Sequence, residues 1–144
     1  MRPRFVVDNS VVMTWCFRDQ ADPYADAVLD SLAAAEAVVP SVWPLEVVNV
    51  LLTAERKNLI HQADSVRFLN LLSQLPLCVE NENAEKAMKD LLGLARSHHL
   101  SSYDAAYLGL AMKTGLPLAT LDEKLRRAAA STNVPVWTVA IPSR

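Results

Sequence analysis

Short runs of β-branched and other apolar residues recur along the chain, and runs of this length predict buried strands. Each run is bounded by a proline, a glycine or a polar residue that breaks the apolar pattern. The predicted strands cover residues 4–7, 37–39, 77–79, 118–121 and 136–139.

The longer segments between these strands carry apolar residues at helical spacing, and several end in recognisable helix signals. Asp22-Pro23 supplies an N-cap followed by proline at the first helical position, and Gly115 followed by Pro117 is typical of a helix end. The predicted helices cover residues 11–17, 23–34, 44–57, 62–73, 83–97, 103–113 and 123–130.

Strands that alternate with helices predict an α/β fold, with a mainly parallel central sheet flanked by helices. At 144 residues, we expect one domain over residues 1–144. In such sheets ligands bind beyond the carboxyl ends of the strands. Asp8 follows the first predicted strand and Asp122 follows a late one, so both acids are predicted at this edge.

Two further acids, Glu46 and Asp104, begin predicted helices and can converge with Asp8 and Asp122 on one crevice. Carboxylates that are packed together repel one another, and Mg²⁺ or Mn²⁺ binds to such oxygen ligands. Two ions in one site can activate a water and stabilise the leaving oxygen of a phosphodiester. The four acids therefore predict a divalent-metal site and phosphodiester chemistry.

Three of these acids also have structural explanations. Asp122 is a favoured N-cap, Asp104 follows Ser101 at capping-box spacing, and Glu46 lies in a first helical turn. Glu46 also belongs to a polar stripe with Asn49, which continues through residues 53 and 56–57. Periodicity alone leaves open whether this stripe faces solvent or lines a cleft.

The formal net charge of −2 is too close to neutral to indicate nucleic-acid binding by overall charge. Any grip on a nucleic acid has to come from local cations, and we select Arg18, Lys124 and Arg126 as candidates. The adjacent His98 and His99 point in different directions on a helix, so we assign them a surface or helix-end role.

Two isolated cysteines without CxxC spacing fit a reducing compartment. No apolar stretch reaches the roughly 18 residues of a membrane-spanning helix, and the first apolar run is too short for a signal peptide. We therefore expect a cytoplasmic protein without a membrane segment.

Four motifs, in this order along nearly the whole chain, resemble the PIN-domain family. They are Phe5-Val6-Val7-Asp8-Asn9-Ser10, the segment from Pro44 to Leu51, the segment from Tyr103 to Leu108, and Thr120-Leu121-Asp122-Glu123-Lys124-Leu125. A lone domain of this size is similar to the VapC-type toxins of bacterial toxin–antitoxin pairs. The resemblance implies a PIN-like α/β/α sandwich and an endoribonuclease that depends on one or two Mg²⁺ or Mn²⁺ ions.

By this resemblance, Asp8, Glu46, Asp104 and Asp122 form the catalytic and metal-binding quartet. Asp8 and Asp104 would be the main metal ligands, Glu46 would serve a second metal or the attacking water, and Asp122 would bind metal directly or through water. Ser10, Asn49 and Thr120 occupy supporting polar positions.

The family also implies an RNA substrate, a homodimer and a small antitoxin partner. Two other interpretations stay open. One is a binding module that keeps the PIN fold without catalysis. The other is a phosphoryl-transfer α/β domain, which is disfavoured because Asp8-Asn9-Ser10 lacks the second acid of a DxD motif.

Overall fold

A parallel sheet forms the centre of the molecule. The computed structural model describes residues 2–139, and within this range four strands pair in the order β3-β2-β1-β4, every neighbouring pair being parallel. The strands are β1 (Arg4–Val7), β2 (Glu36–Pro40), β3 (Leu77–Glu80) and β4 (Leu118–Ala119). The predicted parallel sheet is therefore confirmed.

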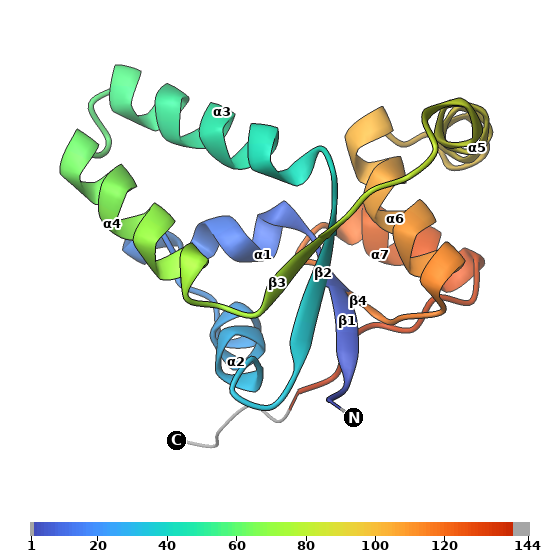
Figure 1. The fold of residues 1–144 in the computed structure, drawn as a ribbon, viewed down its shortest axis with the longest axis horizontal. Coiled ribbons are helices and arrows are strands. Elements are labelled where there is room, and N and C mark those ends of the chain that lie inside the picture. Colours follow the sequence, from blue (N-terminus) through green and yellow to red (C-terminus); the bar gives the residue numbers. More distant parts are fainter. Residues whose placement is uncertain (1, 140–144) are drawn as a thin grey trace.

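Helices cover both faces of this sheet, which gives the predicted α/β/α sandwich (Figure 1). Helices α1 to α4 lie on one side and helices α5 to α7 on the other. Their bounds are α1 (Asn9–Thr14), η1 (Arg18–Gln20, a 3₁₀ helix), α2 (Pro23–Ser31), α3 (Trp43–Arg56), α4 (Gln62–Ser73), α5 (Ala84–His98), α6 (Ser102–Thr114) and α7 (Glu123–Ser131).

The core lies between the sheet and the helices that pack on it. Phe5, Val6 and Val7 of β1 are completely buried, as expected of a strand enclosed on both faces. Helix α6 packs against β1 and β2, and the ring of Trp137 stacks on Phe5 with ring centroids 4.5 Å apart. These contacts fix the position of β1, from which the first acid emerges.

Strand register places two predicted site residues side by side. Val7 of β1 pairs with Ala119 of β4, so the next residues, Asp8 and Thr120, leave the sheet together at its carboxyl edge. The backbone N–H of Asp8 still donates to the carbonyl of Ala119, at 2.9 Å. The topology therefore brings together segments that lie 112 residues apart in sequence.

The late strands are shorter than predicted. Strand β4 ends at Ala119 instead of 121, because the N–H groups of Leu121 and Asp122 donate to side-chain hydroxyls rather than to a neighbouring strand. The predicted strand at 136–139 is reduced to a single bridge between Val136 and Leu118. Beyond this point, the two-residue β4 offers it no further partner.

Two helices also differ from the prediction by more than one residue at an end. Helix α1 occupies Asn9–Thr14 instead of 11–17, and the following N–H groups make i→i−3 bonds, as in Trp15 N–H to the carbonyl of Val12. Helix α2 ends at Ser31 instead of 34 for the same reason, because tightened i→i−3 bonds close its last turn. Its predicted N-cap at Asp22 is confirmed. Of the helices described between residues 2 and 139, none has both the length and the hydrophobicity needed to cross a bilayer.

Candidate functional site

A hydrogen-bond network holds the carboxylate of Asp8 at the end of β1. The hydroxyls of Ser10 and Thr120 both donate to Oδ2 of Asp8, each at 2.7 Å. These hydroxyls in turn accept hydrogen bonds from backbone N–H groups, Leu121 to Ser10 and Asp122 to Thr120, each at 3.0 Å. Within residues 2–139, no side chain donates to Oδ1 of Asp8, and a backbone hydrogen bond from Asn9 adds to the support of this carboxyl group.

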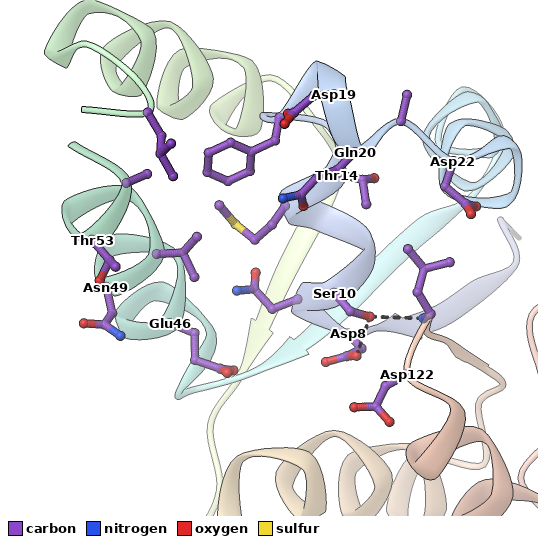
Figure 2. Close-up of a pocket in the computed structure, with 18 of the residues that line it drawn as sticks. Asp8, Ser10, Thr14, Asp19, Gln20, Asp22, Glu46, Asn49, Thr53 and Asp122 are labelled. Atoms are coloured by element: carbon purple, nitrogen blue, oxygen red, sulfur yellow. Dashed lines mark hydrogen bonds between the residues drawn. The ribbon is translucent and has the colours of Figure 1, made fainter. Parts of the chain in front are cut away.

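Asp122 combines two roles at the start of α7. Its Oδ1 accepts a hydrogen bond from the N–H of Leu125 at 3.1 Å. Asp122 is therefore the N-cap of α7, as its position before a predicted helix indicated. Its backbone N–H at the same time belongs to the network around Asp8. The cap orients the Asp122 carboxyl beside Asp8, toward which it points (Figure 2).

Glu46 enters the site from the first turn of α3, and a buried tyrosine positions it. The hydroxyl of Tyr107 donates to Oε1 of Glu46 at 2.6 Å, and the side chain of Tyr107 is completely buried. In Figure 2, Glu46 points toward Asp8 and Asp122. Burial and the adjacent Glu46 raise the pKa of Tyr107 far above its ordinary value, so Tyr107 is a hydrogen-bond donor at every physiological pH.

Asp104 lies in the first turn of α6, one turn before Tyr107. Ser101 caps this helix by accepting the backbone N–H of Asp104 at 3.1 Å. The half-buried Asp104 therefore shares a helix face with Tyr107, the residue that holds Glu46. One helix thus contributes to the site both an acid and the donor to another acid.

All four acids line one cleft of about 1030 Å³. Asp19 and Asp22 also line it, so the described wall carries six carboxylates against a single cation, Lys57. The polar stripe of α3 forms part of the wall through Glu46, Asn49, Thr53 and Lys57. The stripe therefore combines the two arrangements that the helical periodicity left open: it lies along the cleft, but only Glu46 is half-buried, and Asn49, Thr53 and Lys57 are exposed.

Burial and mutual repulsion disfavour the charged forms of three of the acids. Burial raises the pKa of Asp8, and the Asp122 charge adds to this effect, while the bonds from Ser10 and Thr120 oppose it. Burial, together with the charges of Asp8 and Asp104, also raises the pKa of Glu46 against the bond from Tyr107.

The same causes act on Asp104. Burial raises its pKa first, followed by the charges of Asp8 and Asp122, while the nearby ammonium of Lys124 lowers it. The acids are therefore close enough to sense one another, and a cation placed among them would remove the repulsion.

The donor set fits a hard divalent cation that keeps part of its water shell. Across residues 2–139, no three carboxylate, histidine or cysteine side chains are close enough to enclose an ion by themselves. Mg²⁺ nevertheless commonly binds through one or two carboxylates, with waters and substrate phosphates as the other ligands. The buried Oδ1 of Asn9, which lines the same cleft, has no hydrogen-bond partner in the described chain and would accept one from such a water.

The other sequence-predicted residues lie at different distances from the acids. Asn49 is exposed on α3 and points away from the acids in Figure 2. Lys124 is exposed on α7, near Asp104. Arg126 is half-buried: its Nε donates to the carbonyl of Thr120 at 2.9 Å, and its guanidinium lies 5.0 Å from the centre of the Tyr24 ring. The side chain of Arg18 lies outside what the structure describes.

Two residues of this site, Tyr107 and Asn9, are not among those that the sequence patterns predicted. Tyr107 could have been found from its i,i+3 spacing to Asp104, which puts both on one helix face. Asn9 gave a weaker signal, since a polar residue directly after a buried strand is usually a turn residue.

Comparison with known proteins identifies the family and the fold. A family model described as PIN domain matches residues 5–131. Among curated proteins, Ribonuclease VapC3 of Pyrobaculum aerophilum is 28% identical over 122 residues, which cover 85% of this chain and 92% of that protein.

Two solved structures share the fold. PAE2754 from Pyrobaculum aerophilum has a TM-score of 0.69 at 21% identity, and the match covers 94% of this chain and 91% of that one. FitAcB from Neisseria gonorrhoeae has a TM-score of 0.63 at 19% identity, covering 93% of this chain and 96% of that one. The family match spans β1 to α7 and includes all four acids, so the chain belongs to the PIN-domain family.

Proposed function

We propose that this protein is an endoribonuclease that hydrolyses RNA phosphodiesters in the cytoplasm as the toxin of a toxin–antitoxin pair. The observation that carries the proposal is the convergence of Asp8, Glu46, Asp104 and Asp122 on one cleft. The similarity to Ribonuclease VapC3 supports both the ribonuclease activity and the toxin role.

Mg²⁺ or Mn²⁺ fits the hard oxygen ligands of this cleft, with Asp8 and Asp104 as the main ligands and Asp122 as a direct or water-mediated one. When bound, such an ion supplies charge neutralisation for the phosphate and a water of lowered pKa. The chain itself prepares these ligands. Ser10 and Thr120 fix one oxygen of Asp8, and the α7 cap fixes Asp122.

Glu46 is the residue that we assign to the attacking water. Its raised pKa makes it a stronger base than an exposed glutamate, and Tyr107 fixes one of its oxygens while the other stays available. A water held by this second oxygen would lose a proton to Glu46 as it attacks the phosphorus atom. The ester bond between phosphorus and one ribose oxygen would break, and this leaving oxygen would take up a proton from the solvent. The cleft excludes part of the surrounding solvent, which strengthens each of these interactions.

The test is cleavage of a mixed RNA pool by purified protein with Mg²⁺ or Mn²⁺, beside an EDTA control. Asp104→Asn keeps the size of the side chain and removes its charge, so we expect cleavage to be lost. Asp90→Asn is the matched control, because Asp90 is an exposed acid of α5 that does not line the cleft.

The outcomes separate the proposal from its rivals. Cleavage that EDTA and Asp104→Asn both abolish, and Asp90→Asn leaves intact, is the expected result. Cleavage that survives Asp104→Asn would mean a contaminating nuclease or a wrongly placed site. Stoichiometric RNA binding without any cleavage would favour a non-catalytic binding module.

The proposal includes a homodimer and an antitoxin partner. Exposed apolar side chains on α3 and α4 form a surface on which a second copy or an antitoxin could pack. Leu45, Val48 and Leu52 repeat along α3, and Val66 and Leu69 are exposed on α4. Sedimentation of the purified protein alone, and then of the protein co-expressed with the product of an adjacent small gene, tests both associations. If the protein alone sedimented as a monomer, the predicted homodimer would be overturned. If the co-expressed product did not sediment with the chain, the predicted antitoxin partner would be overturned.

A further inference from the structure

A small hollow of about 260 Å³ lies outside the acidic cleft, and lysine, arginine and histidine provide most of its lining. Its lining residues come from the α5–α6 junction and from one face of α7, and we call it the basic hollow: His98, His99, Lys124, Arg127, Ala128 and Ser131. On α7, Lys124, Arg127 or Ala128, and Ser131 follow helical spacing, so they form one continuous face.

The charge of this hollow is opposite to that of the cleft. Four of its six residues are basic or histidine and none is acidic, whereas the described wall of the cleft has six carboxylates and one lysine. Lys124 and Arg127 are exposed, and none of the ion pairs found within residues 2–139 involves them. Their charges are therefore available to an external anion.

The basic hollow is coupled to the acids by sequence and by charge. His98 and His99 begin the segment that leads through Ser101 to Asp104. On the other side, Lys124 follows Asp122 by two residues. The ammonium of Lys124 is near enough to Asp104 to lower the pKa of that acid. Lys124 therefore lies both near the acids and on the wall of the hollow, so a polyanion bound at Asp104 would have this cation within reach.

An RNA-cleaving enzyme with an acidic site needs such a neighbour. The scissile phosphate can be held among the acids only with cations, and the flanking phosphates gain nothing from the carboxylate wall. A structural role explains the histidines only in part. A histidine near the end of α5 interacts favourably with the helix dipole, but this does not account for Lys124 and Arg127 converging from a different helix.

We propose that the basic hollow is a phosphate-binding subsite, in which Arg127 and Lys124, with His98 and His99, hold a backbone phosphate of single-stranded RNA flanking the cleavage point. This inference rests on the proposed ribonuclease function and adds the side from which the RNA is held. Arg126 is not part of the subsite, because its guanidinium is occupied by Thr120 and Tyr24.

The test measures RNA binding and its salt dependence in the full chain carrying Asp104→Asn, which we expect to bind RNA without cleaving it. The probe is a short single-stranded RNA of mixed sequence, titrated in Mg²⁺ at salt concentrations between about 50 and 200 mM. Arg127→Ala should lower the slope of log affinity against log salt by about 0.7, and weaken binding about fivefold at 0.1 M salt. Arg127→Lys should restore most of both values.

Arg96→Ala is the matched control. Arg96 is an exposed arginine on α5, close in sequence to His98, and it does not line the hollow. If Arg96→Ala changed the slope as much as Arg127→Ala, the change would reflect the overall charge of the protein rather than a local site, and the subsite would be overturned. Thermal melts of both variants should match the parent, because both side chains are exposed.

Three further results decide between the possible failures. If the unmodified chain bound and cleaved RNA, and Arg127→Ala changed neither the affinity nor its salt dependence, the subsite would be overturned. The proposed ribonuclease function would not be affected by this result. Absence of both RNA binding and cleavage by the unmodified chain would overturn the proposed function and the subsite with it. Competition by polyglutamate as effective as by unlabelled RNA would show that the hollow accepts acidic peptide, and would overturn its assignment to RNA.

Discussion

At the scale of single residues, the hydroxyl of Thr120 is one of the two hydroxyls that hold the carboxylate of Asp8. It donates to Asp8 and accepts from the backbone of Asp122, and its side chain is completely buried. Thr120→Val keeps the shape but leaves a buried carboxylate oxygen and an N–H group without this partner. We expect a loss of about 1–3 kcal/mol in the free energy of unfolding, measured by urea denaturation.

Thr120→Ser is the control for this prediction, because it keeps the hydroxyl and removes only a methyl group. It should retain most RNA cleavage, whereas Thr120→Val should lose it along with the stability. Equal stability of the two variants would mean that the hydroxyl does not support Asp8.

Tyr107 allows the role of Glu46 to be tested without changing an acid. Tyr107→Phe removes the 2.6 Å bond to Glu46 and keeps the buried ring. Because that bond lowers the pKa of Glu46, its loss should raise this pKa and move the acid limb of the pH–rate profile to higher pH. A hydrogen bond to a charged group contributes about 1.5–3 kcal/mol, so the cleavage rate should fall roughly tenfold or more.

The comparison for this variant is Tyr103→Phe, which removes a hydroxyl from an exposed tyrosine of the same helix. It should leave the rate and the pH profile unchanged. A Tyr107→Phe enzyme whose rate falls but whose acid limb stays in place would show that the tyrosine supports packing rather than the base.

At this scale, sequence predicts which residues carry charge better than it predicts what holds them. The four acids could be placed because strand ends and helix starts are local signals. The spacing of Tyr107 to Asp104 indicates a place on the same helix face, but its bond to Glu46 could not be predicted, because the two residues lie 61 positions apart in the sequence.

At the scale of the element, α7 shows that a capping role and a site role can belong to one residue. Asp122 caps this helix and also lies beside Asp8. Asn is as good an N-cap as Asp, whereas Ala is not. Asp122→Asn should therefore unfold within about 0.5 kcal/mol of the parent, and Asp122→Ala should lose about 1 kcal/mol.

Cleavage should fall strongly in both Asp122 variants, since both remove the charge. Urea denaturation and RNA cleavage on the same preparations check the two halves of this prediction. If Asp122→Asn cleaved RNA at the parental rate, the carboxylate would be a cap alone and would have no part in the site.

Elements were predictable where local signals and tertiary structure agree. Helix α4 was predicted at its observed bounds, Gln62–Ser73, and Asp22 was predicted as the cap of α2. Strand β4 is shorter than predicted because the tertiary structure decides its hydrogen-bond partners. The backbone N–H groups of Leu121 and Asp122 donate to hydroxyls of the site, so they do not pair with a neighbouring strand. Likewise, the polar stripe on α3 could not be assigned to the cleft from periodicity, since solvent and cleft leave the same pattern.

At the scale of the whole molecule, the acids should make stability depend on pH and on metal. Folding raises the pKa values of Asp8, Glu46 and Asp104 above their ordinary values of 3.8, 4.5 and 3.8. Between these values and the raised ones, the folded state binds more protons than the unfolded state. The contribution of these acids to stability is therefore present at low pH and is lost as pH rises through the raised values.

A divalent cation should reverse this loss, because it binds the charged carboxylates of the folded state. Thermal melts in EDTA and in Mn²⁺ should differ more at neutral than at mildly acidic pH. At a free Mn²⁺ concentration of about 100 times its dissociation constant, the gain should be about 2.7 kcal/mol. Asp8→Asn should flatten the pH dependence in EDTA and reduce the shift with Mn²⁺. Identical pH slopes in the parent and in Asp8→Asn would contradict the raised pKa of Asp8, since a side chain that is neutral at every pH cannot reproduce the proton uptake of one that titrates.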